Sequence, residues 1–189
     1  MIEYAFPTPI YHNRVSDFNN IQSKITNSLS KIDFDYNSKW GKTHLISSNL
    51  SERELKRSGL QPLLKEIDVH LKEYCLQLNF ILESYNMCGW FAKFGKDNYA
   101  HLHHHATADI AGVYYYKTNG LDGTLYFESP NQFLPISKCY SRSPVCTWEH
   151  TPMEGKIILF PGWLQHEVTP LNVDDERISF SFNIYMTGK

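Results

Sequence analysis

The stretch from Lys156 to Pro170 reads Lys-Ile-Ile-Leu-Phe-Pro-Gly-Trp-Leu-Gln-His-Glu-Val-Thr-Pro and contains the pattern that decides the fold. An aliphatic run is interrupted by Pro161-Gly162, and a second short run begins at His166. Short apolar and β-branched runs that end at proline and glycine are typical of β-strands separated by turns. The stretch therefore predicts two short strands with a tight connection between them.

The same texture extends in both directions from this stretch, from Leu82 to the end of the chain. Turn-forming pairs such as Asn119-Gly120 separate the candidate strands. Many short strands at this spacing predict an antiparallel sandwich or barrel. The candidates are Ser84–Phe94, Ala111–Lys117, Thr124–Glu128, Val145–His150, Lys156–Phe160, His166–Pro170 and Arg177–Met186, with one earlier strand around Lys42–Ser47.

The first third of the chain follows a helical repeat instead. Apolar residues recur every three or four positions in Asp17–Ile32, and Ser51-Glu-Arg-Glu54 has the form of a capping box that opens a second helix reaching Leu78. Gly59 and Pro62 predict a break within that second helix. We therefore expect a mainly β, α+β fold in which the helices pack on one outer face of the strands.

Composition excludes several classes of protein. The 189 residues carry a formal net charge of −2, which gives no electrostatic case for a nucleic-acid partner. No apolar run is long enough for a membrane span, and the start lacks the layout of a secretory signal, so we expect a cytoplasmic protein. The whole chain is read as one domain, with residues 1–83 as helical support and 84–186 as the β core. Four widely spaced cysteines are read as reduced thiols: Cys75, Cys88, Cys139 and Cys146.

A histidine cluster, His101-Leu-His-His-His105, holds four of the nine histidines. In an extended segment residues two apart point to the same side, so His103 can converge with either His105 or His101. Imidazole is a common ligand of Fe(II), Zn(II) and other divalent first-row metals. The pattern predicts two metal ligands in one of these two registers, and a polar, solvated loop is the alternative.

His166, at the start of its strand, offers a third imidazole. The strand that follows, Arg177-Ile-Ser179-Phe-Ser-Phe-Asn183, alternates with a period of two. Hairpin pairing of the two strands would bring His166 opposite Ser179, on the face that also carries Arg177. For His166 taken alone, a structural hydrogen-bonded role is the alternative.

An arginine on this face requires an anionic partner, because burying its charge alone is costly. Its planar fork matches a carboxylate through two hydrogen bonds. We therefore expect Arg177 and Ser179 to bind the distal carboxylate of a small diacid. An ion pair between Arg177 and a nearby Asp or Glu, such as Glu167, is the alternative.

Five motifs in chain order carry a resemblance to a known family. They are His-x-His, Gly112-Val-Tyr-Tyr-Tyr, Asp122-Gly-Thr-Leu-Tyr-Phe, Gly155-x4-Phe-Pro-x4-His166 and Arg177-x-Ser. The series resembles the Fe(II)/2-oxoglutarate-dependent oxygenases, in particular the prolyl-4-hydroxylase-like branch that is frequent in phages and marine bacteria. The resemblance covers residues 84–186.

This resemblance implies a double-stranded β-helix, or jelly roll, supported by the N-terminal helices. It implies Fe(II) held by His166 and by two histidines of the cluster. His103 and His105 are the preferred pair because their alignment needs no insertion before Gly112, and His101 with His103 is the alternative register.

The resemblance also implies 2-oxoglutarate and O2 as cosubstrates. Arg177 and Ser179 match the family's grip on the C5 carboxylate. Tyr114 and Tyr116 lie on the strand where the family often turns an aromatic hydroxyl toward 2-oxoglutarate, and a role as core aromatics is the alternative. The implied activity is hydroxylation of a substrate with oxidative decarboxylation of 2-oxoglutarate to succinate. No catalytic residue is implied beyond the metal ligands.

One departure from the family pattern stands out. Most members have His-x-Asp or His-x-Glu, whereas no acidic residue lies two positions after any histidine of this cluster. A three-histidine site is therefore expected, and it leaves the metal centre more positive. The alternative function is a non-catalytic cupin-like module that binds a metal or ligand. No motif identifies the prime substrate.

Overall fold

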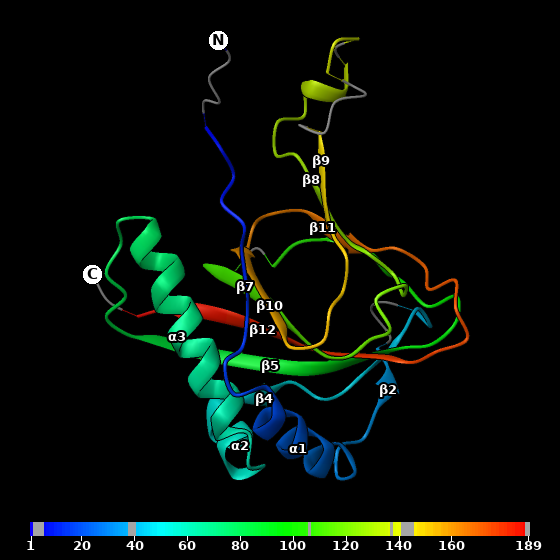
Figure 1. The fold of residues 1–189 in the computed structure, drawn as a ribbon. Helices are drawn as coiled ribbons and strands as arrows, with labels where there is room; N and C mark the ends of the chain where they lie inside the picture. Colours follow the sequence, from blue (N-terminus) through cyan, green and yellow to red (C-terminus); the bar gives the residue numbers. More distant parts are fainter. Residues whose placement is uncertain (2–5, 38–40, 106, 137, 141–145, 188–189) are drawn as a thin grey trace.

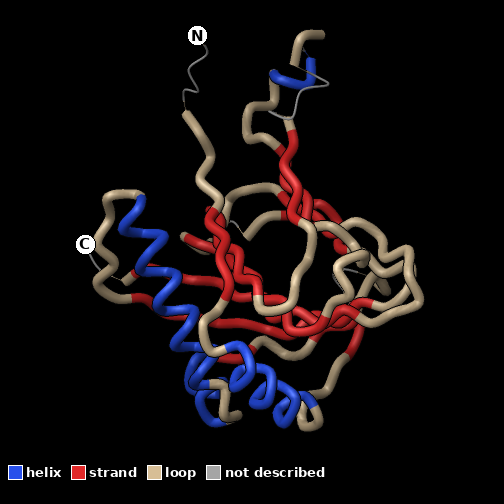
Figure 2. The backbone as a smooth tube through the Cα atoms, in the orientation of Figure 1, coloured by secondary structure: helices blue, strands red, loops and turns tan. Residues whose placement is uncertain are grey.

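Two antiparallel β-sheets and three α-helices make up the described part of the chain (Figures 1 and 2). The computed structural model describes residues 1–189 except 2–5, 38–40, 106, 137, 141–145 and 188–189. This arrangement confirms the mainly β class and the sandwich predicted from the strand pattern.

The larger sheet has eight strands. Its hydrogen-bonded order is β1-β10-β7-β12-β5-β3-β2, and β4 also pairs with β5. The bounds of its strands are β1 Tyr11–Arg14, β2 Asp35–Tyr36, β3 Leu45–Ile46, β4 Leu50–Ser51, β5 Tyr85–Phe94, β7 Ile110–Lys117, β10 Lys156–Pro161 and β12 Arg177–Met186. Its two longest strands, β5 and β12, pair along their full length from Arg177↔Phe94 to Met186↔Tyr85.

The smaller sheet has four strands in the order β6-β11-β8-β9. Its strands are β6 Ala100–His103, β8 Leu125–Glu128, β9 Thr147–His150 and β11 His166–Val168. Between β8 and β9 the chain continues outward and includes a short 3-10 helix, Leu134–Ile136 (Figure 1).

The helices cover one face of the larger sheet, as predicted. They are α1 Phe18–Leu29, α2 Glu52–Arg57 and α3 Gln61–Gln77. The capping box at Ser51 and Glu54 starts α2, and the expected break falls between α2 and α3, where Gly59 adopts a φ of +81°. Residues of β12 with even numbers, such as Phe180 and Phe182, pack with these helices in the main core.

The alternation of β12 gives the two faces of the larger sheet different chemistry. Its odd-numbered residues Arg177, Ser179 and Ser181 line a cavity to which residues of the smaller sheet also contribute. One face of β12 thus packs in the main core, and its other face lines the cavity.

The predicted hairpin between His166–Pro170 and the strand from Arg177 is wrong. β11 pairs with β6 and β8 in the smaller sheet, whereas β12 pairs with β5 and β7 in the larger one. Consecutive strands therefore enter opposite sheets, a choice that the turn residues between them do not specify. The first residue of the predicted strand Val145–His150 lies outside the described residues.

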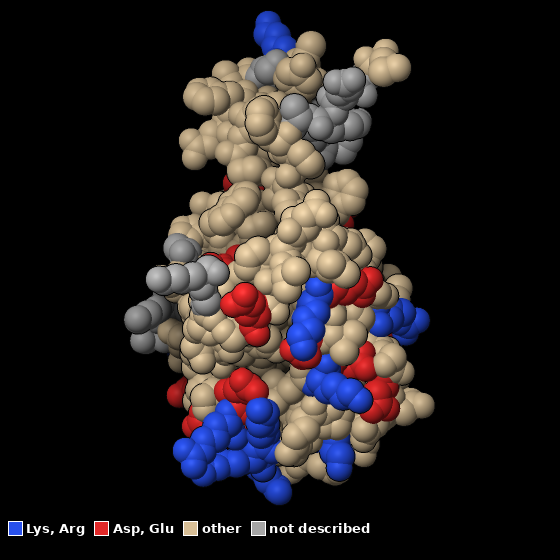
Figure 3. All heavy atoms as spheres, turned by 90° about the vertical axis from the view of Figure 1, so that its left-hand side faces the viewer, with Lys and Arg blue, Asp and Glu red and all other residues tan. Residues whose placement is uncertain are grey.

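The surface and the cysteines agree with the composition. On the face shown in Figure 3, acidic and basic side chains are interspersed, and both kinds gather on its lower half. The four cysteines are free thiols, with Cys75 and Cys146 buried and Cys139 exposed. Among the described residues, no helix has the length and apolar character to cross a membrane.

Candidate metal centre and cosubstrate pocket

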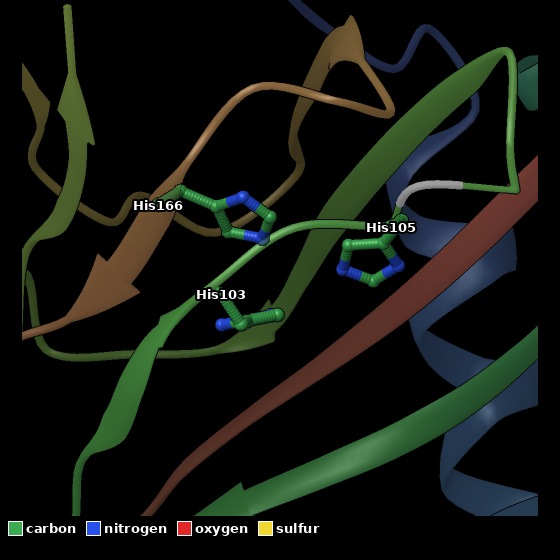
Figure 4. A group of neighbouring side chains, drawn as sticks. All are labelled: His103, His105 and His166. Carbon is green, nitrogen blue, oxygen red and sulfur yellow. The ribbon is translucent and has the colours of Figure 1, made fainter. Parts of the chain in front are cut away.

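His103, His105 and His166 converge on one point (Figure 4), and one ring nitrogen from each lies within 4.8 Å of the others. His103 ends β6 and pairs directly with His166 at the start of β11. His105 follows β6, and its backbone N–H donates to the carbonyl of Gly162 at 2.7 Å. The Pro161-Gly162 turn therefore fixes the backbone of His105, and the chain then continues to His166.

Backbone carbonyls orient two of these three rings. Nδ1 of His103 lies 2.7 Å from the carbonyl oxygen of His101, and Nδ1 of His166 lies 2.8 Å from that of Leu164. Because a carbonyl only accepts, each Nδ1 carries the proton and each Nε2 keeps its lone pair. Both rings are thus in the tautomer that offers Nε2 as a ligand.

Burial keeps the three imidazoles neutral. Burial lowers the pKa of His103 to about 4 and lowers the pKa of His105. The pKa of His166, which is 4% exposed, falls well below its usual value, chiefly through burial and then through repulsion from His103. Neutral imidazole is the form that binds a metal, so this donor set fits a divalent first-row cation.

The structure leaves His101 outside this group. Its side chain is exposed and contacts the ring of Tyr99 edge-on at 4.8 Å, while its carbonyl serves as the acceptor for His103. His104 is also exposed, although it contributes to the cavity rim. The geometry therefore corresponds to the preferred register, with His103 and His105 on the same side.

A cavity of about 440 Å³ opens beside the three histidines. Arg177, Ser179, His103, His105 and His166 all line it, together with apolar and aromatic side chains from both sheets. The cavity is large enough for a small diacid beside the imidazoles and leaves room for part of a second molecule.

Arg177 is the most deeply buried charged residue of the site, with 1% of its surface exposed. Its Nη1 donates to the carbonyl of Gly123 at 2.6 Å, and the guanidinium lies 4.2 Å from the centre of the Phe94 ring. Its Nε is buried without a hydrogen-bond partner among the described residues. No ion pair joins it to Glu167, the alternative partner, within the part of the chain that the structure describes.

Asp122 is a buried carboxylate that interacts electrostatically with Arg177, and the sequence did not single it out for this role. It is 1% exposed and accepts a hydrogen bond from Thr118 Oγ1. Its Oδ2 is buried and has no hydrogen-bond partner among the described residues. Burial lowers the pKa of Arg177, and electrostatic interactions with Tyr115 and then with Asp122 oppose that shift. Asp122 lies in the Asp-Gly-Thr motif noted in the sequence, but nothing in that motif indicates a role toward Arg177.

Tyr114 does not reach the cavity. It packs in the main core with the helices, and its hydroxyl is buried without a described partner. Tyr116 also faces that side, where its hydroxyl contacts Thr26 Oγ1 at 2.7 Å. The neighbour Tyr115 lines the cavity instead, 5.9 Å from the Arg177 guanidinium, because alternate residues of β7 face opposite sides of the sheet. Of the tyrosines at 114–116, Tyr115 is therefore the one that lines the cavity.

Comparison with known proteins identifies the family. A family model described as "Putative 2OG-Fe(II) oxygenase" matches residues 89–183, a range that contains the three histidines, Arg177 and Ser179. The chain belongs to this family, as the motif series indicated. No curated protein matches the chain in sequence.

Solved structures agree on the fold. A Pseudomonas putida prolyl-4-hydroxylase aligns over 96% of this chain and 94% of its own, at 12% identity and a TM-score of 0.66. The viral collagen prolyl hydroxylase from Paramecium Bursaria Chlorella virus-1 aligns over 94% and 96%, at 12% identity and a TM-score of 0.59. HygX from Streptomyces hygroscopicus, solved with nickel, 2-oxoglutarate and hygromycin B, aligns over 95% and 84%, at 10% identity and a TM-score of 0.62. The predicted jelly-roll fold is confirmed.

Proposed function

We propose that this protein is an Fe(II)- and 2-oxoglutarate-dependent dioxygenase that hydroxylates a substrate still to be identified. The observation that carries the proposal is the meeting of three neutral imidazoles and a buried arginine in one cavity of about 440 Å³. A site that only stored a metal would not need a buried guanidinium beside the ligands. Membership of the oxygenase family supports the same conclusion.

In this proposal His103, His105 and His166 hold the metal. Each is neutral at physiological pH because burial lowers its pKa. When bound, Fe(II) would supply the redox chemistry that couples decarboxylation of 2-oxoglutarate to succinate with oxidation of the substrate.

Arg177 and Ser179 bind the far carboxylate of 2-oxoglutarate. Two residues apart on β12, they share the face that lines the cavity. The guanidinium is held by Gly123 and Phe94, so its orientation is set before 2-oxoglutarate arrives and little entropy is lost on binding. Ser179 adds a hydroxyl donor on the same side.

The walls of the cavity exclude water from this charge pair. Phe94, Tyr115 and Phe160 are each at most 3% exposed and line the same cavity. In such a low-dielectric environment a carboxylate–guanidinium contact is stronger than in water. The Tyr115 hydroxyl, whose pKa burial raises to about 12, remains protonated and able to donate a hydrogen bond toward the carboxylate.

The proposal includes the whole chain as one working unit. The main core joins residues of α1 and α3, such as Ile25 and Ile67, to residues of β12, such as Phe180. The segment 1–83 thus supports the sheet from behind, and the segment 84–186 carries the site.

The proposal is tested by oxygen-dependent conversion of 2-oxoglutarate to succinate by the Fe(II)-loaded protein. We expect slow turnover without prime substrate, abolished in His166→Ala and in His105→Ala. His101→Ala is the matched control, because His101 belongs to the same cluster but lies outside the converging group, and it should retain turnover.

Two outcomes would contradict parts of the proposal. If His101→Ala abolishes turnover and His105→Ala does not, the other register of the cluster holds the metal. If the protein binds Fe(II) and 2-oxoglutarate but makes no succinate even when candidate substrates are supplied, the cupin-like binding module becomes the better description. The three-histidine ligand set is the feature that favours that second candidate.

A further inference from the structure

The three histidines differ in what holds their rings. His103 and His166 each have a backbone carbonyl, two residues earlier, as the partner of Nδ1. Among the described residues, no backbone carbonyl contacts the ring of His105. A metal-binding histidine normally has a fixed partner on its second nitrogen, because that partner selects the tautomer and the ring orientation. The partner of His105 must therefore be sought among side chains.

Stacking fixes the plane of the His105 ring. Its ring lies 5.2 Å from that of His166 at an interplanar angle of 14°, and 5.7 Å from that of Trp90 on β5 at 15°. The imidazole thus lies nearly parallel to two neighbouring rings. Stacking alone does not determine which nitrogen carries the proton, so a polar group at the ring edge is required.

Asn183 provides that polar group. It continues the polar alternation of β12, after Arg177, Ser179 and Ser181, and Figure 4 shows the ring of His105 beside this strand. Its Nδ2 donates to the hydroxyl of Tyr185 at 3.4 Å, which leaves the carboxamide oxygen as the atom available to His105. That oxygen is buried, and among the described residues it has no hydrogen-bond partner of standard geometry, so it is an acceptor still to be satisfied.

The electrostatics of His105 agree with this placement. Burial lowers the pKa of His105, and the nearby side chain of Asn183 opposes that shift. Because the carboxamide oxygen of Asn183 only accepts, it is the atom that can receive a hydrogen bond from a ring N–H of His105.

We propose that Asn183 is the positioning residue of the third metal ligand: its Oδ1 accepts the N–H of one His105 nitrogen, so that the other nitrogen presents its lone pair to the metal. This inference rests on the proposed metal site. It gives Asn183, near the end of β12, a role distinct from that of Arg177 and Ser179, which bind 2-oxoglutarate in the proposed function. One strand therefore orients both the cosubstrate and the imidazole that stands in place of the family's usual carboxylate.

The test is a Co(II) titration of the metal-free full-length protein at pH 8, followed through the visible absorption of bound Co(II). Asn183→Leu removes the acceptor at similar volume, and Asn183→Asp retains an acceptor oxygen. Asn86→Leu is the matched control: the same substitution at an exposed position of β5, beside Tyr185. The melting temperature of each metal-free variant reports whether it folds.

We expect Asn183→Leu to bind Co(II) about 10- to 100-fold more weakly, with an altered visible spectrum. Asn183→Asp should keep the wild-type spectrum and at least the wild-type affinity, and Asn86→Leu should match wild type. Wild-type affinity and spectrum in a folded Asn183→Leu would overturn the inference. A loss of Co(II) affinity of more than about tenfold in Asn183→Asp would also overturn it. If Asn183→Leu does not fold, the Asn183→Asp result decides the question.

The same titration separates this inference from the proposed function. Wild-type protein that binds no Co(II) would overturn the metal site, and the role of Asn183 with it. Normal binding by wild type that is lost in His105→Ala but unaffected in Asn183→Leu would overturn the role of Asn183 alone.

Discussion

Replacement of Arg177 by methionine should separate the two roles of this buried cation, cosubstrate binding and charge balance. Methionine retains much of the side-chain volume but removes the guanidinium that contacts Gly123 and Phe94. It also removes the favourable electrostatic interaction between Arg177 and the carboxylate of Asp122, which is 1% exposed. Two distinct losses follow, and each has its own magnitude.

The first loss is affinity for 2-oxoglutarate. A charge-assisted hydrogen bond contributes about 1.5–3 kcal/mol, so losing a two-pronged contact should cost about 3–4 kcal/mol, or about 10²- to 10³-fold in Kd. The second loss is stability: we expect about 3–4 kcal/mol, of which about 2 kcal/mol comes from the uncompensated charge of Asp122 and the rest from the carbonyl of Gly123 left without its donor.

The double variant Arg177→Met/Asp122→Asn distinguishes the two losses. Asparagine removes the buried charge and can still accept the hydrogen bond from Thr118. Urea unfolding should recover about 2 kcal/mol relative to the single variant, while calorimetric titration of the metal-loaded protein with 2-oxoglutarate should show no recovery of affinity. Cosubstrate affinity that returns together with stability would refute the reasoning, because Arg177 would then act only through the fold.

Three further predictions concern the metal site and acid stability. His166→Ala should lose bound Fe(II), measured as metal content after desalting, and full retention of the metal would contradict the three-histidine site. Gly162→Ala should weaken metal binding and destabilise the protein by about 1–3 kcal/mol, because the new Cβ would lie 2.0 Å from the carbonyl oxygen of Ala108; Gly95→Ala, with its nearest contact at 3.8 Å, is the control and should change neither. Burial lowers the pKa of His44 and His150 to about 4 in the folded protein. Below pH 6.5 the unfolded chain therefore binds more protons than the folded protein, and the stability present above that pH is lost as the pH falls toward 4. Each histidine should lower the free energy of unfolding by about 2 kcal/mol between pH 7 and pH 5. Urea unfolding of the metal-free protein at the two pH values checks this, and a free energy of unfolding that does not fall would count against it.

Local pattern was sufficient to predict the elements that depend on local chemistry. The break between α2 and α3 follows from Gly59 and Pro62, and the strand that ends at Pro161 follows from an aliphatic run stopped by a turn. The two-residue periodicity of β12 likewise predicted that Arg177 and Ser179 share one face of the strand, and both line the cavity. In each case the decisive residues are neighbours in sequence.

The sequence did not show which sheet each strand joins or which face of a strand each residue occupies. The turn after β11 was compatible with a hairpin, but β12 pairs in the other sheet, because pairing is decided by distant strands such as β5. Tyr114 and Tyr116 were predicted from the resemblance, whereas Tyr115 lines the cavity; which tyrosine of this run faces the cavity depends on how β7 packs between β10 and β12. A register shift between Ile178 and Ser179 adds to this dependence.

The polar residues that support the site were the least predictable. Asp122 acts on Arg177 from a separate loop, and Asn183 faces His105 from a strand 78 positions later in the chain. Neither residue has a sequence signal of its own beyond lying in a motif or an alternating strand. Their roles arise only when the two sheets come together around the cavity.

The central claim is that the three histidines and Arg177 form a single site for a metal and 2-oxoglutarate. Anaerobic titration of the metal-free protein with Fe(II) and then with 2-oxoglutarate, followed by visible absorbance, tests it most directly. We predict a weak charge-transfer band that appears only when both are present and is absent in Arg177→Met at the same 2-oxoglutarate concentration. Bound iron with no such band in the wild-type protein, at any 2-oxoglutarate concentration, would contradict the claim.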